Sequence, residues 1–333
     1  MVISTSRRPV TARAEVAGPA APGSRPRRPS RARRALRQVR RHWQLYLLVL
    51  PPLAFLAVFH YEPLLGAQIA FRNYNPTQGI WHSPWIGLQE IRSWVDNPEF
   101  WPVMRNTLSV GVYSLLVGTP CTIILALAIN ELRSPKVKKF VQTVTFFPYF
   151  ISVAVLVGIM QLVLAPGTGL VAEVARVLGF HSIPNVLASP TAFASLYVWS
   201  GVWQTTGYGA IIYLGVLTSV DPELYEAARI DGASILQKIR NVDLPAIMPT
   251  AIVLLILSLG NILTVGFEKA YLLQNSLNLS TSQVISTYVY EAGLTQGAFS
   301  FGTAVGLFNS VISLVLIVIV NAAAKRLSGS SLY

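Results

Sequence analysis

The amino-acid sequence predicts an all-α membrane protein with six transmembrane helices and both termini in the cytoplasm. Hydrophobic residues make up 53% of the 333 residues and charged residues only 12%, whereas a soluble domain carries about twice that share of charge. The mean hydropathy is +0.51. Six apolar runs are each about 20 residues or longer, enough to cross a bilayer as a helix. These runs lie at about 44–64, 106–129, 140–164, 191–219, 248–267 and 299–321.

Four prolines lie inside the predicted spans: Pro51, Pro52, Pro120 and Pro148. Membrane helices tolerate proline because neighbouring groups satisfy the freed carbonyls, so these residues do not argue against the spans. The fourth run is longer than a bilayer requires, and we expect it to tilt or to extend beyond the membrane.

Residues 1–43 form an arginine-rich tail that precedes the first span. This tail holds twelve arginines and one glutamate, so it accounts for almost all of the net charge of +12. It has almost no large apolar residues, which predicts a disordered segment. A basic cytoplasmic tail sets topology and attracts membrane lipid, and the remaining chain is nearly neutral. The charge therefore does not indicate nucleic-acid binding.

The distribution of Lys and Arg predicts the orientation of the six-span domain, residues 44–333. With the N-terminus inside, 21 of the 26 basic residues fall on the cytoplasmic side, as the positive-inside rule requires. The sequence thus predicts a multi-pass protein of the cell inner membrane. It also places the charged loop 220–246 in the cytoplasm.

This cytoplasmic loop carries the signals of two short helices. Asp221 is a good N-cap, Pro222 suits the first helical position and Gly232 suits the position after the C-cap, which predicts a helix over Pro222–Asp231. Ser234 can cap a second helix. We expect that second helix to end at Leu244-Pro245, before the fifth span.

Two interpretations of this loop stay open on the residues alone. Leu224, Tyr225 and Ala228 share one face of the first helix, so the loop could be an amphipathic anchor at the membrane surface. Ala227 and Ala228 are small and allow another backbone to approach, so it could equally be a rigid knob that docks into a cleft of a cytoplasmic partner.

The sequence lacks the patterns of an enzyme or of a nucleotide-binding subunit. No G-x-x-x-x-G-K-[ST] pattern occurs, so the chain has no phosphate-binding loop of its own. The four histidines do not pair as metal ligands, and the single cysteine, Cys121, lies within a span. We therefore expect no catalytic residues, metal or cofactor in this chain. A membrane enzyme would need a carboxylate cluster or a soluble catalytic domain, and neither is found.

The stretch "EAARIDGASILQKIRNVDLP", Glu226 to Pro245, resembles the EAA loop of binding-protein-dependent ABC importer permeases. Val242 stands where the family pattern has Ile. The resemblance extends from about residue 43 to the C-terminus, and "FHYEPLLGAQIAFRNYNP" and "SLGNILTVGFEKAYLL" are most similar to the carbohydrate-uptake permeases, polysaccharide and oligosaccharide branch. It implies a type I importer permease fold and import of a saccharide, alginate being one candidate.

The resemblance also implies a set of partners and a coupling site. The first loop helix would be the coupling helix that sits in a groove of an ATP-hydrolysing subunit. Its residues are Leu224, Tyr225, Glu226, Ala227, Ala228 and Gly232. The complex would contain two ATP-binding subunits that hold ATP and Mg, a second homologous permease as a heterodimer, and an extracytoplasmic solute-binding protein.

Polar and aromatic residues within the spans are candidates for the solute path. They are Trp199, Trp203, Gln204, Asn261, Glu268 and Asn309. Asn261 and Glu268 are seven apart, which would place them on one face of the fifth span. Polar residues in spans more often join helices to one another. Four tryptophans in 71–107 either form an interfacial belt or face entering sugar.

The sequence does not identify the solute. The outer segments hold five basic and seven acidic residues. This charge balance does not indicate whether the solute is a neutral sugar or a uronate. The alternatives are an importer of a non-sugar solute and an ion-coupled secondary carrier. A carrier would need buried carboxylates and usually a second repeat.

Overall fold

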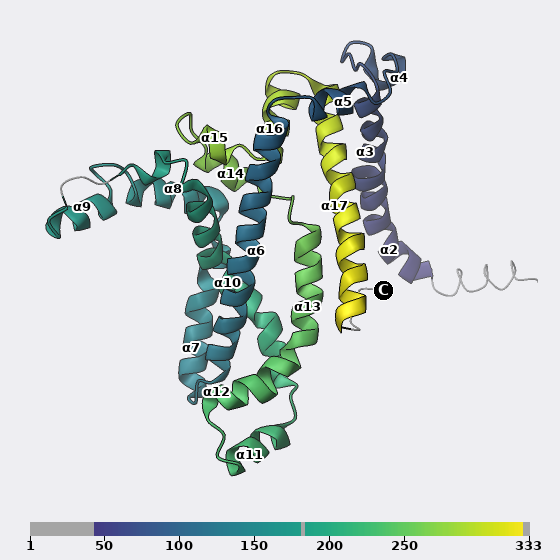
Figure 1. Ribbon diagram of the computed structural model, residues 1–333. Helices are drawn as coiled ribbons and strands as arrows, with labels where there is room; N and C mark the ends of the chain where they lie inside the picture. The colour runs from purple at the N-terminus through teal and green to yellow at the C-terminus, as the bar shows by residue number, and fades with distance from the viewer. Residues whose placement is uncertain (1–42, 181–183, 329–333) are drawn as a thin grey trace, which may run out of the picture. The chain divides into compact units, whose positions relative to one another are not determined.

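The computed structural model describes residues 43–180 and 184–328 (Figure 1). The described chain contains helices and no named strand, and its one extended pairing is an isolated bridge between Arg72 and Trp85. The chain divides into two compact units, residues 1–63 and 64–333. The predicted tail 1–43 lies outside the described residues except for Trp43.

The first unit contributes one apolar helix. Its parts are α2 (Trp43–Leu56) and the π-helical turn η1 (Ala57–Tyr61), and α3 (Glu62–Leu64) begins at its end. Pro51 and Pro52 lie inside α2. With the adjoining turn η2 (Leu65–Phe71) of the second unit, the helical segment is 29 residues long and apolar enough to cross a membrane, which confirms the first predicted span.

Three further helices in the described chain are long and apolar enough to span a membrane. They are α6 (Phe100–Asn130), the continuous helix Ile235–Gly260 and the first 24 residues, Phe299–Ala322, of α17 (Phe299–Ser328). The helix Ile235–Gly260 consists of α12 (Ile235–Lys238), the π-helical turn η5 (Ile239–Asp243) and α13 (Leu244–Gly260). The second, fifth and sixth predicted spans are therefore present as helices.

The fifth span differs from the prediction at both ends. Its helix stops at Gly260 rather than at about residue 267. The second loop helix does not end at Leu244-Pro245, because it continues without a break into α13. Pro245 lies in the first turn of α13, directly after the π-helical turn. Its missing N–H removes one hydrogen bond from this continuous helix, directly after the π-helical turn that already departs from the i→i−4 pattern.

The third predicted span is not one straight helix. The helix α7 (Pro135–Phe146) runs into the 3-10 turn η3 (Phe147–Phe150), and α8 (Val153–Val163) then leaves at a bend of 96°. Pro148 lies in η3, and Ser152 caps α8 by accepting a hydrogen bond from the N–H of Val155. The described chain has four apolar spans, or five if this bent pair is one span. Six spans are not confirmed.

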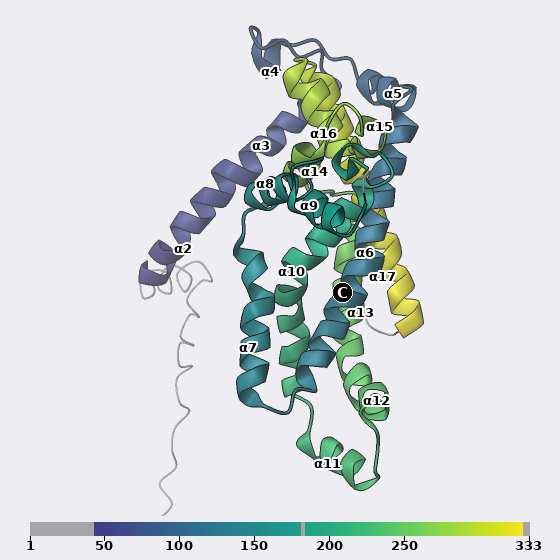
Figure 2. The same ribbon diagram turned by 90° about the vertical axis from the view of Figure 1, so that its left-hand side faces the viewer.

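The fourth predicted span folds as the helix α10 (Phe193–Thr218), which has 26 residues but is not among the described helices that are apolar enough to cross a membrane. It packs along α6, with α7 on its other side (Figures 1 and 2). Gly207 makes this close approach possible, because a Cβ there would collide with the backbone carbonyl of Thr145 in α7. Buried apolar residues of α6, α10 and α13 form one hydrophobic core cluster.

Short helices fill the end of the second unit that is opposite to the charged loop (Figure 1). They are α4 (Gly79–His82), α5 (Gln89–Val95), α9 (Leu170–Val177), η4 (Val186–Ala188), α14 (Phe267–Leu273), α15 (Leu279–Ser282), α16 (Ile285–Val289) and η6 (Tyr290–Thr295). Trp94 is fully buried against Phe100 and Tyr288. Trp81, Trp85 and Trp101 are exposed, so one of the four tryptophans in 71–107 belongs to the core.

Candidate functional site

The first helix of the charged loop folds nearly as the sequence predicts. The helix α11 spans Pro222–Ile230, one residue shorter than expected, and the carboxylate of Asp221 accepts a hydrogen bond of 2.9 Å from the N–H of Glu223. Gly232 has a φ of 68°. Its N–H donates to the carbonyl of Arg229, and the N–H of Ala233 donates to that of Ala228. This pair of bonds is a Schellman motif, which explains why glycine stands at this position.

The tip of α11 presents apolar and small side chains to the exterior. Ile230 is 86% exposed and Leu224 is 52% exposed. Glu226 and Ala227 are exposed, and nothing lies within 4 Å of a Cβ built on Gly232. Sequence reasoning missed Ile230, although an apolar residue directly before the C-cap of a charged loop is a usable signal. Exposed apolar groups on a polar loop occur at contacts with proteins or with membranes, so both interpretations of the loop remain compatible with this surface.

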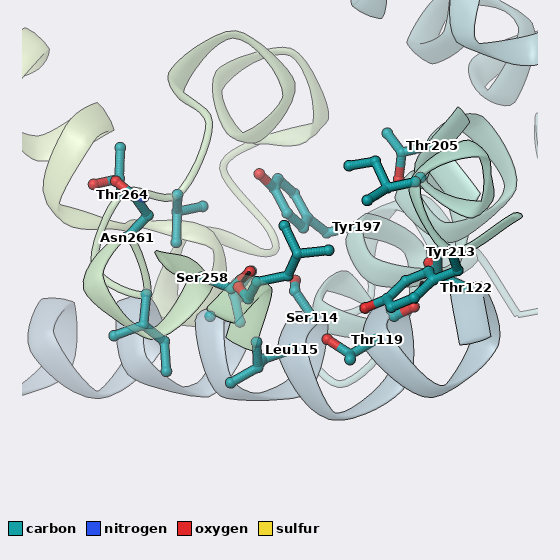
Figure 3. A pocket seen from close by; sticks show the side chains of 18 residues that line it. Ser114, Leu115, Thr119, Thr122, Tyr197, Thr205, Tyr213, Ser258, Asn261 and Thr264 are labelled. Carbon is teal, nitrogen blue, oxygen red and sulfur yellow. Dashed lines mark hydrogen bonds between the residues drawn. The ribbon is translucent and has the colours of Figure 1, made fainter. Parts of the chain in front are cut away.

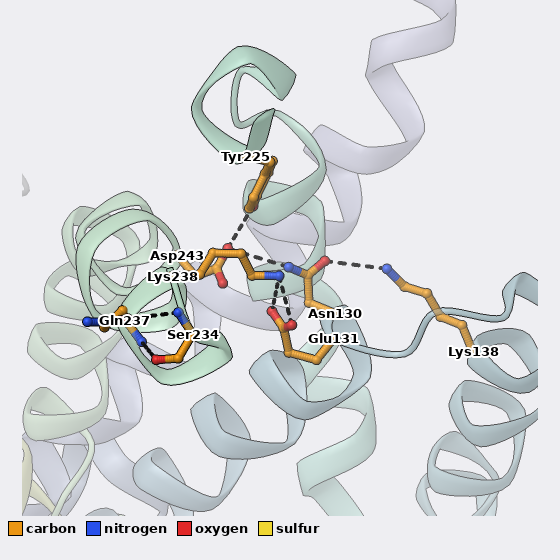
Figure 4. A network of polar contacts seen from close by, with 8 residues as sticks. All are labelled: Asn130, Glu131, Lys138, Tyr225, Ser234, Gln237, Lys238 and Asp243. Atoms are coloured by element: carbon orange, nitrogen blue, oxygen red, sulfur yellow. Dashed lines mark hydrogen bonds and ion pairs between the residues drawn. The ribbon is translucent and has the colours of Figure 1, made fainter. Parts of the chain in front are cut away.

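The opposite face of α11 is fixed to the spans by polar contacts (Figure 4). The hydroxyl of Tyr225 donates a hydrogen bond of 2.6 Å to Oδ1 of Asp243, which is fully buried in η5. The amide of Asn130, at the end of α6, donates to the same oxygen at 3.5 Å. Burial and the Asp243 carboxylate raise the pKa of Tyr225, so the phenol stays neutral and remains a donor.

A salt bridge reinforces this connection between the loop and α6. Nζ of Lys238 lies 2.7 Å from the carboxylate of Glu131, and the same Nζ lies 5.5 Å from the ring centroid of Tyr225. Nζ of Lys138 in α7 donates to the side-chain oxygen of Asn130 at 3.4 Å. Helices α6, α7, α11 and α12 and the turn η5 therefore meet in one polar cluster, which can transmit a displacement of α11 to the spans.

A cavity of about 450 Å³ lies between α6, α10 and the end of α13 (Figure 3). Its wall carries hydroxyl, phenol and amide groups from three helices and the adjoining loop. Among them are Ser114, Thr119, Tyr197, Tyr213, Ser258 and Asn261. None of the residues that line it is charged, so its chemistry suits neutral hydroxylated groups.

The structure separates the residues that the sequence groups as a solute path. Asn261 lines the cavity, and its amide donates to the carbonyl of Leu257. The prediction that Asn261 and Glu268 share a face of one helix is wrong. The helix α13 ends at Gly260, and Glu268 is exposed on the separate helix α14. The chain turns between them, so helical spacing does not apply.

The other path candidates lie outside this cavity. Trp199 and Trp203 are exposed on α10, and the indole N–H of Trp199 donates to the hydroxyl of Tyr113 at 3.0 Å. The amide of the buried Gln204 donates to the carbonyl of Ile151 at 2.7 Å, at the break before α8. This contact is the helix-joining role that polar residues often have. A path role for these three residues stays a prediction.

Asn309 is the remaining path candidate, and it does not line the cavity. The side-chain oxygen of Asn309, on α17, is buried and has no hydrogen-bond partner within the described chain. No group of three His, Cys, Asp or Glu residues that could hold a metal occurs in residues 43–180 and 184–328. The thiol of Cys121 is free and half-buried.

The chain matches the family described as binding-protein-dependent transport system inner membrane component over residues 118–329. It is 40% identical over 289 residues to protein LplB of Bacillus subtilis (strain 168), covering 87% of this chain and 91% of that protein. It is also 40% identical over 289 residues to the polygalacturonan/rhamnogalacturonan transport system permease protein YteP of the same organism, covering 87% and 90%.

Solved structures show the same similarity in three dimensions. One is a bacterial ABC transporter involved in the import of the acidic polysaccharide alginate, with a TM-score of 0.81 and 37% identity over 89% of this chain and 99% of that chain. Another is a bacterial alginate ABC transporter in complex with an alginate pentasaccharide-bound periplasmic protein, with 35% identity and the same coverage and TM-score. The resemblance inferred from the loop is thereby confirmed. The chain belongs to the binding-protein-dependent transport system inner membrane components, the permease subunits of ABC transporters.

Proposed function

We propose that this chain is the transmembrane subunit of an ATP-driven importer that moves an acidic oligo- or polysaccharide from a solute-binding protein into the cytoplasm. One observation carries the proposal beyond family membership. The helix α11 presents Ile230 and Leu224 outward while Tyr225 joins it to buried Asp243. An exposed apolar tip on a rigidly held helix can bind a partner and transmit its movement.

The partner at this tip is an ATP-hydrolysing subunit. The chain carries no phosphate-binding loop, so ATP and Mg bind on partner subunits, and each coupling loop engages one of two such subunits. A second, homologous permease completes the translocation pore as a heterodimer. The loop and both termini then face the cytoplasm, as the distribution of basic residues predicts.

The relatives support an acidic saccharide as the solute. YteP is described as a polygalacturonan/rhamnogalacturonan permease, and the solved transporter imports alginate. Both solutes contain uronic acids. The cavity between α6, α10 and α13 carries hydroxyl and aromatic groups, which suit the hydroxyls and apolar faces of sugar rings.

Reconstitution tests the proposal. The complex of this permease with its partner permease and ATPases is placed in proteoliposomes, and uptake of a uronate oligosaccharide is measured with and without ATP and the solute-binding protein. We expect uptake to require both. Uptake driven by an ion gradient without ATP would instead identify a secondary carrier, and ATP-dependent uptake of a non-sugar solute alone would overturn the solute assignment.

A further inference from the structure

Five basic side chains belong to the outer segments of the sequence: Arg72, Arg92, Arg105, Arg176 and Lys269. Three of them have partners within the described chain. Arg72 donates to the carbonyl of Ser83 at 2.9 Å, and Arg176 forms a salt bridge with Glu173. Nζ of Lys269 donates to the carbonyl of Tyr197 at 2.6 Å and lies 4.7 Å from its ring centroid. These three cations have roles within the fold.

The two remaining arginines differ in their surroundings. Arg92 lines a hollow together with Asp96, so a carboxylate is already near it. Arg105 lies on α6, one turn after its start, and is exposed. Its guanidinium forms no hydrogen bond or ion pair with residues 43–180 or 184–328. Of the five outer cations, Arg105 alone has neither a described partner nor an acidic residue beside it.

Arg105 lines a hollow of about 550 Å³ that lies between α6, the start of α10 and α15. This volume is in the range of small-molecule sites, about 300–1,000 Å³. The wall contains Trp101, Ser109, Thr191, Ser280 and Thr281 in addition to Arg105. None of the lining residues is acidic, so the guanidinium meets no protein carboxylate there.

The arrangement of these side chains on α6 suits a charged sugar. Trp101 and Arg105 are four residues apart, which places them on one helix face, and Trp101 is 74% exposed. An indole ring packs against the apolar C–H face of a sugar. A guanidinium binds a carboxylate through two parallel hydrogen bonds, a geometry that lysine cannot reproduce. Hydroxyls of Ser109 and Ser280 can bond the ring hydroxyls.

We propose that the hollow around Arg105 is a uronate-binding site at the outer end of the translocation path, in which Arg105 binds the carboxylate and Trp101 supports the sugar ring. The inference rests on the proposed function and deepens it, because it names the residue that would favour acidic over neutral saccharides. A simple membrane-interface role would require only an aromatic ring and a basic residue. It would not require the hydroxyl-lined hollow between three elements.

The test measures ATP-dependent uptake into proteoliposomes of a uronate oligosaccharide and of its methyl ester, each at saturating solute-binding protein. The variants are Arg105→Gln, Arg105→Lys and the control Arg92→Gln. We expect Arg105→Gln to lower maximal uptake of the uronate about tenfold or more, because the carboxylate loses one charged hydrogen-bonding partner. Uptake of the ester should change less than about twofold, and half-saturation by the binding protein should be unchanged. Maximal uptake of the uronate by Arg105→Lys should lie between that of the wild type and that of Arg105→Gln, and uptake by Arg92→Gln should equal that of the wild type.

Each other result has a distinct meaning. If Arg105→Gln takes up the uronate as fast as the wild type does, the inference is overturned and the proposed function remains intact. An equal fall for uronate and ester, or weaker saturation by the binding protein, overturns it in favour of a docking role. A reduced yield of assembled complex assigns Arg105 to the interface with the second permease instead. If the wild-type complex takes up neither saccharide with ATP, the proposed function itself fails.

Discussion

The hydroxyl of Tyr225 donates a 2.6 Å hydrogen bond to Oδ1 of Asp243, and this bond joins the exposed helix α11 to the helix that becomes the fifth span. Asp243 is fully buried, and its second oxygen has no hydrogen-bond partner within the described chain. Within the described chain, the carboxylate therefore accepts its hydrogen bonds from Tyr225 and Asn130.

Removing this hydroxyl should uncouple ATP hydrolysis from transport. Tyr225→Phe retains the ring but removes a hydrogen bond to a buried carboxylate, which contributes about 1.5–3 kcal/mol. We expect fewer solute molecules transported per ATP, with unchanged co-purification of the ATPase subunits. Tyr208→Phe is the matched control, because that hydroxyl makes no hydrogen bond within residues 43–180 and 184–328. Equal coupling in the two variants would show that the Tyr225 bond transmits no movement.

A bulky residue at the end of α11 should impair docking more than folding. Gly232 has a φ of 68°, and a Cβ there meets no atom within 4 Å. Gly232→Leu should cost only about 1 kcal/mol through its backbone conformation. Its side chain would hold α11 away from the ATPase, so stimulated ATP hydrolysis should fall while the membrane level of the permease is retained. Gly232→Asn tolerates positive φ and should be milder. Loss of the permease from the membrane in both variants would indicate a folding defect instead.

The amide of Gln204 should stabilise the break between α7 and α8. Its hydrogen bond of 2.7 Å satisfies the carbonyl of Ile151, which the 96° bend removes from a helix. Gln204→Leu leaves that carbonyl without its partner, and we expect a loss of about 1–3 kcal/mol. The melting temperature of the purified complex should fall below that of the exposed-site control Gln78→Leu. Identical melting temperatures would contradict this role.

Stability should rise with pH because of Lys269. Burial lowers its pKa from 10.5 to about 8, so the unfolded chain binds more protons between these values and stability increases as pH rises above 8. The gain by pH 9 is about 1 kcal/mol. Lys269→Met lacks this titration. The melting temperature of wild type relative to Lys269→Met should therefore increase from pH 7 to pH 9, and a constant difference would argue against a lowered pKa.

Local signals in the charged loop predicted its structure well. Asp221, Gly232 and Ser234 act through neighbours in sequence, and each caps its helix as expected. The capping box of Ser234 and Gln237 is present in full. By contrast, the bond between Tyr225 and Asp243 joins residues 18 apart, and no local pattern reports such a contact.

The features that the sequence predicted incorrectly or did not identify depend on local stop signals and on long-range contacts, which a hydropathy profile does not report. The end of α13 at Gly260-Asn261 is a helix-stop signal within an apolar run. At the bend before α8, the carbonyl of Ile151 accepts a hydrogen bond from Gln204, which is 53 residues away in the sequence. The hollow at Arg105 is formed by α6, the start of α10 and α15, so a count of outer charges could not distinguish this arginine from those that are already paired.

Ile230 gives the most direct test of the coupling site. Its side chain is 86% exposed at the tip of α11, and Val177 on α9 is equally exposed. Reconstituted complexes carry either Ile230→Ser or Val177→Ser. In each complex, two quantities are measured: the ATP hydrolysis that the loaded solute-binding protein stimulates, and the amount of permease. A lost contact of about 2 kcal/mol would weaken ATPase binding roughly 25-fold or more, so we predict that Ile230→Ser loses most stimulation and Val177→Ser retains it. Full stimulation with Ile230→Ser at normal permease levels would contradict docking through α11.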